Sequence, residues 1–186
     1  TLENVEKIDV VVFDKTGTLT TGLLKYTQTI ALIGFTESEV LKLAATAERP
    51  SEHPIAQAIV EGAKNQNIKI SMPSGFTSFP GGGVKATAEG MDVFVGNAAF
   101  ISSNGITFSE LEQQASELRE KGQTVVFVAT SGKIAGLISV SDTTRSESNQ
   151  VVKDLHSKDI LVYMITGDNP KTAMYLAKSL GIDQVI

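Results

Sequence analysis

Residues 8–20 read IDVVVFDKTGTLT, and this stretch decides the fold. Its first part, Ile8–Asp14, is a continuous apolar run rich in valine, which is typical of a buried strand in a parallel sheet. A turn follows at Lys15–Thr18. Ligands of open α/β sheets bind beyond the carboxyl ends of the strands, so Asp14 stands where a functional carboxylate is expected.

The last part of the chain repeats this kind of pattern from Thr144 onward. We expect a helix over 147–157, a strand over 160–165, a turn at 166–168, a helix over 170–180 and the start of a strand at 184–186. Alternating strands and helices predict a parallel sheet. Because the turn at 166–168 also follows an apolar strand, it can converge with Asp14 on one site.

The segment between these two parts of the chain has a different sequence pattern. Short strands separated by glycine turns are expected over 76–80, 84–88 and 91–95, after a longer strand over 26–33. A hairpin is expected over 124–129 and 133–140. Helices are expected over 36–48 with a Thr36/Glu39 capping box, from His53-Pro54 to Asn65, and over 107–121 with a Thr107/Glu110 capping box. The antiparallel hairpins predict a second, separate sheet.

The chain is therefore expected to be an α/β protein with a discontinuous architecture. Residues 1–21 and 141–186 form a partial Rossmann-like domain with a parallel sheet. Residues 22–140 form an inserted α+β domain with an antiparallel sheet.

Composition excludes several classes of protein. The 186 residues are 41% hydrophobic and 20% charged, with a net charge of -5, so nucleic acid is not an expected partner. The absence of cysteine excludes disulfides and thiolate metal sites. No apolar run reaches the roughly 18 residues that a membrane span needs. Both ends of the sequence look cut, so we expect a piece of a longer protein.

A carboxylate at Asp14 suits phosphoryl transfer. It can attack the γ-phosphorus of ATP and form an aspartyl phosphate, a reaction that needs charge neutralisation more than acid–base catalysis. Mg²⁺ prefers oxygen ligands, which Asp14 and the backbone carbonyl of Thr16 can supply. Groups that can hold phosphate oxygens come from Lys15, Gly17, Thr18, Thr166 and Gly167. Taken alone, Asp14 reads more simply as a turn residue that ends a strand.

The motif DKTGTLT at 14–20 resembles the phosphorylation motif of P-type ATPases, which belong to the haloacid-dehalogenase-like superfamily. TGDN at 166–169 resembles the second motif of the same family. The resemblance implies that Asp14 accepts phosphate, that Thr166 contacts it, and that Asp168 lies near the nucleotide and Lys15.

Related phosphatases carry a second Asp two residues after the nucleophile, where this chain has Thr16. Without that general base, water attack on the phosphoenzyme is disfavoured. This position favours a pump over the alternative of a soluble phosphatase.

SEHP at 51–54 resembles the signature of the heavy-metal-transporting branch. The resemblance implies that His53 orients the adenine ring and that Glu48 contacts its amino group. On its own, His53 reads as a polar residue at a helix start. Gly81 and Gly83 look like the nucleotide loop of this branch, and Asn97 is expected to bond the nucleotide or pin that loop. His156 lies outside every motif and is predicted to be structural.

Two questions stay open at this stage. The segment 142–145, DTTR, resembles the hinge that returns the chain from the inserted domain, and it fits a helix cap with a surface charge as well as a catalytic role. The later family motifs, a lysine-bearing segment and GDGxND, do not occur in this sequence. A catalytically idle nucleotide-binding fragment is therefore an alternative.

The sequence thus predicts the ATP-binding and aspartyl-phosphate-forming core of a heavy-metal P-type ATPase, using ATP and Mg²⁺. Its partners would be the transported ion and the actuator and transmembrane domains of the parent, an integral membrane protein with this part in the cytoplasm. Copper is the first expectation for the ion, since copper pumps with the SEHP signature are common, followed by zinc, cadmium or lead. Selectivity itself depends on membrane ligands that lie elsewhere.

Overall fold

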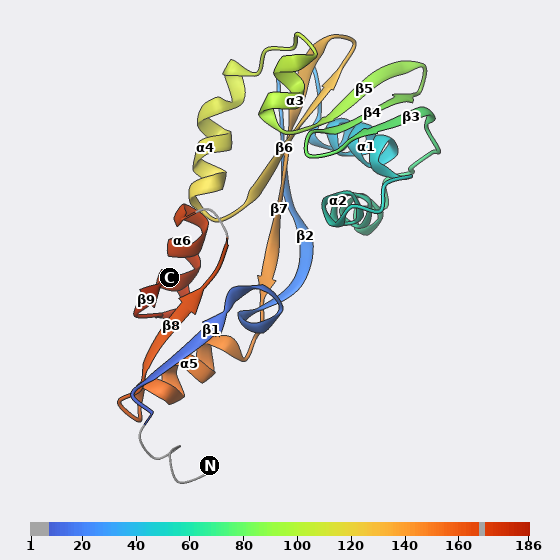
Figure 1. Ribbon diagram of the computed structural model, residues 1–186. Coiled ribbons are helices and arrows are strands. Elements are labelled where there is room, and N and C mark those ends of the chain that lie inside the picture. Colours follow the sequence, from blue (N-terminus) through green and yellow to red (C-terminus); the bar gives the residue numbers. More distant parts are fainter. Residues whose placement is uncertain (1–7, 168–169) are drawn as a thin grey trace. The chain divides into compact units, whose positions relative to one another are not determined.

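The computed structural model describes residues 8–167 and 170–186. The chain divides into two compact units, drawn in Figure 1. Unit 1 comprises residues 1–23, 120–122 and 142–186, and unit 2 comprises 24–119 and 123–141. The chain passes between the units at 23/24 and 141/142, where the sequence predicted 21/22 and 140/141; the sequence did not assign 120–122 to unit 1.

Unit 1 contains a three-stranded parallel sheet in the order β1-β8-β9. Its elements are β1 (Val10–Asp14), η2 (Lys15–Leu19), α5 (Ser148–His156), β8 (Leu161–Ile165), α6 (Pro170–Leu180) and β9 (Gln184–Val185). Apolar side chains of the two helices, among them Val152 and Ala177, pack on Val162 and Met164 of β8. The predicted parallel sheet is confirmed.

The prediction that the strand at Ile8–Asp14 is buried was wrong. Val10 is 38% exposed and Val12 is 49% exposed in β1. The core of unit 1 takes its sheet residues from alternate positions of β8, Val162 and Met164, so the described helices cover one face of the sheet. A continuous apolar run predicted cover on both faces.

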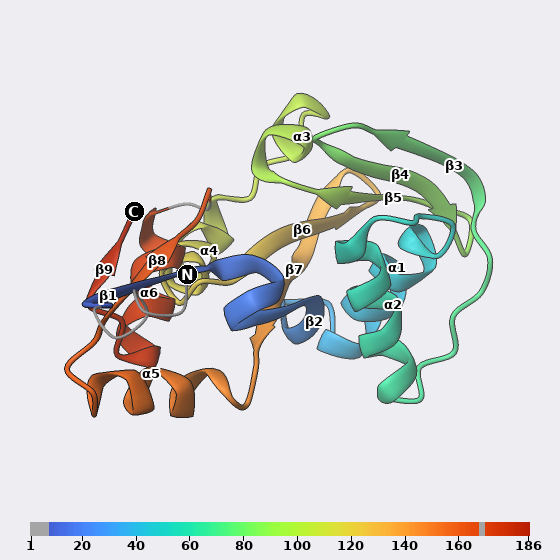
Figure 2. The ribbon, with the colours of Figure 1, turned by 60° about the horizontal axis from the view of Figure 1, so that its bottom comes forward.

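Unit 2 is built on a six-stranded sheet in the order β2-β7-β6-β5-β4-β3, shown in Figure 2. The strands are β2 (Thr20–Ala31), β3 (Ser74–Phe79), β4 (Gly83–Ala88), β5 (Met91–Gly96), β6 (Thr124–Thr130) and β7 (Lys133–Thr144). Pairing from β3 through β7 is antiparallel, as predicted. Strands β2 and β7 are longer than expected because each continues past the residues at which the chain passes between units.

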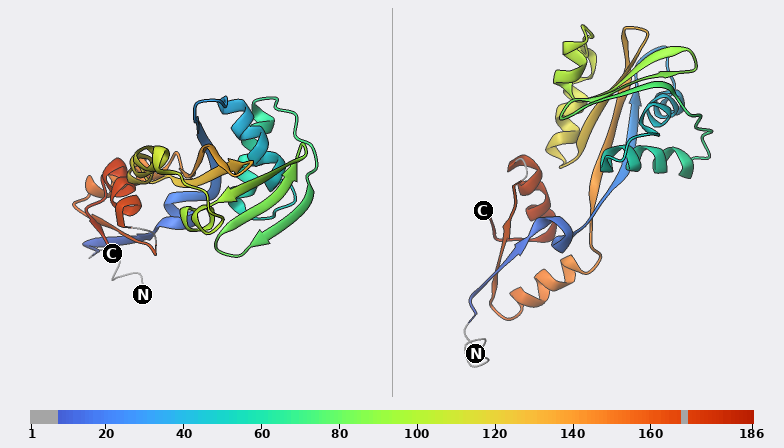
Figure 3. Two further views of the ribbon diagram at one scale, coloured as in Figure 1. Left: turned by 90° about the horizontal axis from the view of Figure 1, so that it is seen from above. Right: turned by 45° about the vertical axis from the view of Figure 1, so that its right-hand side comes forward.

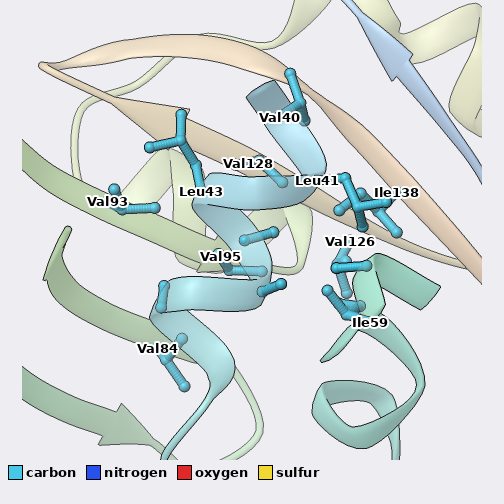
Figure 4. Close-up of a cluster of buried hydrophobic side chains, with 14 of the residues drawn as sticks. Val40, Leu41, Leu43, Ile59, Val84, Val93, Val95, Val126, Val128 and Ile138 are labelled. Atoms are coloured by element: carbon cyan, nitrogen blue, oxygen red, sulfur yellow. The ribbon is translucent and has the colours of Figure 1, made fainter. Parts of the chain in front are cut away.

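Helices cover both faces of this sheet, as the views in Figure 3 show for α1 and α4. One face carries α1 (Glu37–Glu48) and α2 (Pro54–Asn65), and the other carries α3 (Ala98–Ser103), η3 (Ser109–Leu111) and α4 (Glu112–Glu120). Strand β6 supplies both cores, with Val126 and Val128 facing α1 and Phe127 facing α4. Figure 4 shows the first of these cores around α1.

The helix starts were predicted with mixed success. The Thr36/Glu39 capping box is present, with Thr36 N–H donating to Glu39 Oε2 and Glu39 N–H donating to Thr36 Oγ1. The capping box at Thr107 and Glu110 is wrong, because η3 begins at Ser109 with no side-chain cap. The short helix α3 was not predicted. None of the described helices is both long enough and apolar enough to cross a membrane.

Candidate functional site

The structure brings Asp14 and Thr166 to the same edge of the sheet in unit 1. Strands β1 and β8 are parallel neighbours, and Asp14 is paired in register with Ile165, the residue before Thr166. Both strands therefore end side by side at their carboxyl ends, the usual place for ligands in such sheets. Asp14 is exposed and so accessible to a substrate. Asp168 lies outside the described residues.

The backbone after Asp14 makes a tight excursion that presents the motif. Gly17 has φ 79, in the left-handed region that glycine adopts without strain, and Thr16 has φ -80 and ψ 120. Thr16, Gly17 and Thr18 are exposed, whereas Lys15 is buried. We call residues 14–20 the acceptor loop.

The buried Thr20 lies at the base of the acceptor loop, where only 1% of its surface is exposed. Its Oγ1 is 2.5 Å from Asp142 Oδ2 and 3.1 Å from the carbonyl oxygen of Lys15, and it accepts the N–H of Gly17 at 3.3 Å. A hydroxyl has one proton to donate, and the short distance assigns it to the carboxylate.

Residues 142–148, which we call the return segment, hold the carbonyl groups of the same loop. Arg145 Nη2 donates to Gly17 O at 2.9 Å, and its Nε donates to Thr20 O at 3.1 Å. Leu19 O accepts two bonds, from Arg145 N–H at 3.0 Å and from Ser148 Oγ at 2.8 Å. The sequence left the role of this segment open. These contacts show that it hydrogen-bonds the backbone carbonyl groups of the acceptor loop.

In unit 2, Glu48 occupies the last residue of α1. The side chain is buried, with 6% of the residue exposed. Burial raises the pKa of Glu48 to about 7, although a hydrogen bond with Ser51 acts in the opposite direction. A carboxylate is also unfavourable at a helix C-terminus, where the helix dipole is negative. Such an arrangement costs stability and is typical of a functional position.

His53 is exposed and caps the N-terminus of α2. The ring atom Nδ1 accepts the main-chain N–H of Ile55 at 3.2 Å, and the main-chain N–H of His53 donates to Ser51 Oγ at 3.3 Å. Because Nδ1 is an acceptor, the neutral ring carries its proton on Nε2. The imidazole therefore has an N–H donor left for a ligand.

The glycine turn, residues 80–83, is held by Asn97. The side-chain Nδ2 of Asn97 donates to Gly81 O at 2.8 Å, and its Oδ1 accepts the N–H of Phe100 at 2.9 Å. Its main-chain N–H donates to Gly82 O at 2.9 Å. Asn97 thus pins the turn and caps α3, which is one of the two arrangements that the sequence suggested.

The two glycines that the sequence singled out in this turn differ in their surroundings. Gly81 has φ +71 and open space around it, as in a turn that glycine makes without strain. A Cβ on Gly83 would lie 2.2 Å from Val95 O, so the neighbouring strand β5 requires a glycine there. Figure 4 shows Val84, the next residue, beside the end of α1 opposite Val40, the end at which Glu48 lies.

A divalent cation would find few protein ligands among the candidate site residues. No group of three His, Cys, Asp or Glu side chains that could hold a metal occurs in the described part of the chain. Asp14 and the carbonyl of Thr16 nevertheless fit Mg²⁺, which takes oxygen ligands, keeps several waters and is held by one or two carboxylates together with substrate phosphates.

Comparison with known proteins places this geometry in a family. Residues 8–186 match the haloacid dehalogenase-like hydrolases. The chain belongs to this family. The membership agrees with an aspartate at the end of the first parallel strand.

Among curated members, the chain is 40% identical over 185 residues to "Copper-transporting ATPase 2" of Rhizobium meliloti, covering 100% of this chain and 22% of that protein. It is 41% identical over 186 residues to "Probable copper-exporting P-type ATPase V" of Mycobacterium tuberculosis, covering 100% of this chain and 24% of that one. The chain thus spans less than a quarter of the length of these relatives.

Solved structures agree with this assignment. A zinc-transporting PIB-type ATPase in its E2.Pi state has a TM-score of 0.89 and 33% identity, covering 98% of this chain and 30% of that chain. The N-domain of HMA8, a copper-transporting P-type ATPase, has a TM-score of 0.54 and 35% identity, covering 63% of this chain and 99% of that chain. The predicted resemblance to heavy-metal P-type ATPases is confirmed.

Proposed function

We propose that this haloacid dehalogenase-like chain is the ATP-binding and phosphate-accepting part of a heavy-metal-translocating P-type ATPase, with Asp14 as the acceptor. The observation that carries the proposal is the position of Asp14. It is an exposed carboxylate at the carboxyl end of β1, paired in register with Ile165 and followed by the acceptor loop. Unit 1 is the phosphorylation domain in this proposal, and unit 2 is the nucleotide-binding domain.

Unit 2 binds ATP through the end of α1, the start of α2 and the glycine turn. Glu48 and the free N–H donor of His53 face the adenine, and Gly81 and Gly83 let the backbone approach the nucleotide. Asn97 supports this site by fixing the turn. The burial of the Glu48 carboxyl at a helix C-terminus supports a role in binding, because a purely structural position gains nothing from it.

In unit 1, an oxygen of Asp14 attacks the γ-phosphorus of ATP. The bond between that phosphorus and the β–γ bridging oxygen breaks, and ADP leaves with the electron pair. Bound Mg²⁺ neutralises the charge of the phosphates, and Asp14 and the carbonyl of Thr16 would hold it. Phosphate oxygens are held by hydroxyl and N–H groups and by local positive charge, supplied by Lys15, Gly17, Thr18, Thr166 and Gly167. Asp168 is assigned to the nucleotide side by its motif.

Thr16 then decides how long the product lasts. A threonine has no carboxylate with which to accept a proton from attacking water, so the aspartyl phosphate persists. A persistent intermediate suits a pump that couples phosphorylation to transport. The same position in a soluble phosphatase would need a general base.

The relatives support copper as the transported ion, since those from Rhizobium meliloti and Mycobacterium tuberculosis are named as copper transporters. The complete protein would then sit in a membrane, with this part in the cytoplasm and with actuator and transmembrane domains as its partners.

The test is phosphorylation of the complete protein by ATP labelled on its γ-phosphate, with copper or zinc added. We expect a hydroxylamine-sensitive label that copper stimulates more than zinc. The label should be absent in Asp14→Asn and present in Asp9→Asn, a control that removes a nearby exposed carboxylate. Label in Asp14→Asn would refute the assignment of Asp14 as the phosphate acceptor. Stimulation by zinc but not by copper would indicate that zinc, rather than copper, is the transported ion.

A further inference from the structure

The return segment touches the acceptor loop at more points than a connecting segment requires. The carbonyl oxygens of Gly17, Leu19 and Thr20 all accept hydrogen bonds from Arg145 or Ser148. The distances lie between 2.8 and 3.1 Å, the range of well-formed hydrogen bonds. Three carbonyl groups within residues 17–20 are thereby fixed from outside the loop.

The guanidinium of Arg145 is used for this purpose in an unusual way. It donates from Nε and Nη2 to two carbonyl groups of one loop, and no ion pair with a carboxylate is recorded for it among the residues that the structure describes. A planar fork of donors sets the spacing between the two oxygens that it bonds. Arg145 therefore sets the distance between Gly17 and Thr20, which lie on either side of Thr18.

The hydroxyl of Thr20 connects the acceptor loop to the return segment. It accepts the N–H of Gly17 and donates to Asp142, while the second carboxylate oxygen of Asp142 is buried without a partner in the described residues. Thr20 and Asp142 also lie on the two strands, β2 and β7, that lead out of unit 1 and back into it. The contact links the conformation of the acceptor loop to the residues at which the chain re-enters the unit.

We infer that Arg145 and Ser148 are positioning residues for phosphoryl transfer, an inference that rests on the proposed function. They hold the backbone of the acceptor loop in the one conformation that presents Asp14 and the exposed residues 16–18 to the γ-phosphate. Neither residue belongs to the proposed nucleotide site in unit 2. Their loss should therefore slow phosphorylation without weakening ATP binding.

The experiment compares Arg145→Lys, Ser148→Ala and the control Ser146→Ala. Lysine keeps the charge of Arg145 but not its two-donor fork. Within the part of the chain that the structure describes, the Ser146 hydroxyl bonds only to Glu147. In the complete protein, Arg145→Lys should lower the rate of phosphorylation from ATP on the order of tenfold to a hundredfold, with unchanged ATP affinity. Ser148→Ala should lower it less, because Leu19 O keeps its bond from Arg145 N–H. Ser146→Ala should match the wild type.

Amide hydrogen exchange on this chain gives a second, independent readout. Exchange at residues 15–20 should be faster in Arg145→Lys and Ser148→Ala than in Ser146→Ala, with no change in unit 2. If Arg145→Lys does not fold, as judged by thermal unfolding, Ser148→Ala decides the question.

The outcomes distinguish a failure of the positioning role from a failure of the proposed function. Unchanged phosphorylation rates in folded variants, with a labelled wild type, would overturn the positioning role. A wild type that takes no label would refute the proposed function, and with it any positioning role in phosphoryl transfer, whatever the exchange rates of the loop. Equal loss of rate and of ATP affinity would also overturn it, since that result indicates a general structural role.

Discussion

The acceptor loop of unit 1 and the glycine turn of unit 2 each carry a short motif, but different groups hold their backbones. The acceptor loop is fixed by side chains from the return segment, which bond its carbonyl oxygens. The glycine turn is held by Asn97, which donates to the carbonyl oxygens of Gly81 and Gly82. Its sequence is also restricted, because β5 leaves no room for a Cβ at Gly83. The comparison shows that a residue within a motif can be required for packing as well as for contact with a ligand.

In unit 2, the largest expected effect on stability comes from Glu48. Burial raises the pKa of this carboxyl from its ordinary value of 4.5 to about 7, so the folded state binds the proton more tightly than the unfolded state. The stabilising contribution of this proton is fully present below about pH 4.5 and is lost as the pH rises through about 7. Glu48→Gln should therefore raise the free energy of unfolding at pH 8 by on the order of 3 kcal/mol, and by little at pH 4.5.

Urea unfolding of both proteins at the two pH values measures this effect. A gain in stability together with weaker ATP binding would indicate that Glu48 is kept for function at a cost in stability. If Glu48→Gln gives no gain at pH 8, Glu48 is not buried as a destabilising carboxylate.

The packing requirement at Gly83 gives the next largest effect. Gly83→Ala must move the backbone of β5, so we expect a loss of roughly 3 kcal/mol in the free energy of unfolding. Gly81→Ala serves as the matched variant, because it meets no atom within 4 Å and suffers only from its φ of +71. The expected loss for Gly81→Ala is about 1 kcal/mol. Equal losses for both variants in urea unfolding would contradict the distinction between a packing glycine and a turn glycine.

His53 should show a smaller effect on stability, with two separable parts. His53→Ala removes the cap of α2 and should cost about 1 kcal/mol in the free energy of unfolding. His53→Asn keeps an acceptor for the N–H of Ile55, so its stability should stay close to that of the wild type. Thermal unfolding of both variants checks this. A loss in His53→Asn as large as that in His53→Ala would mean that the cap is not the stabilising feature.

Much of the fold was predictable because local signals decide it. The Thr36/Glu39 capping box and Pro54 set the starts of α1 and α2, and the continuous apolar run of β6 fits a strand covered on both faces. The short α3 was missed because six residues give no periodic pattern, although Asn97 as its cap was a usable signal. The exposed face of β1 was missed because an apolar run does not reveal which faces are covered.

The candidate site was predictable only in part, for a similar reason. Motif residues such as Asp14 and His53 stand out in the sequence, and the parallel sheet that contains β1 and β8 follows from the alternation of strands and helices. The support from Arg145 and Ser148 comes from residues far along the chain, and a hydrogen bond to a backbone carbonyl leaves no signature in sequence. The closeness of Val95 to Gly83 likewise depends on the pairing of β4 and β5.

The central claim is that unit 2 binds the nucleotide while Asp14 of unit 1 accepts the phosphate. Calorimetric titration of this chain with ATP in the absence of Mg²⁺ tests it directly, using His53→Asn and Asp14→Asn. We predict that His53→Asn weakens ATP binding about tenfold, the loss of roughly one hydrogen bond. Asp14→Asn should bind at least as tightly as the wild type, because it removes a negative charge that repels the phosphates. Unchanged affinity in His53→Asn, with weakened binding in Asp14→Asn, would contradict this division of roles.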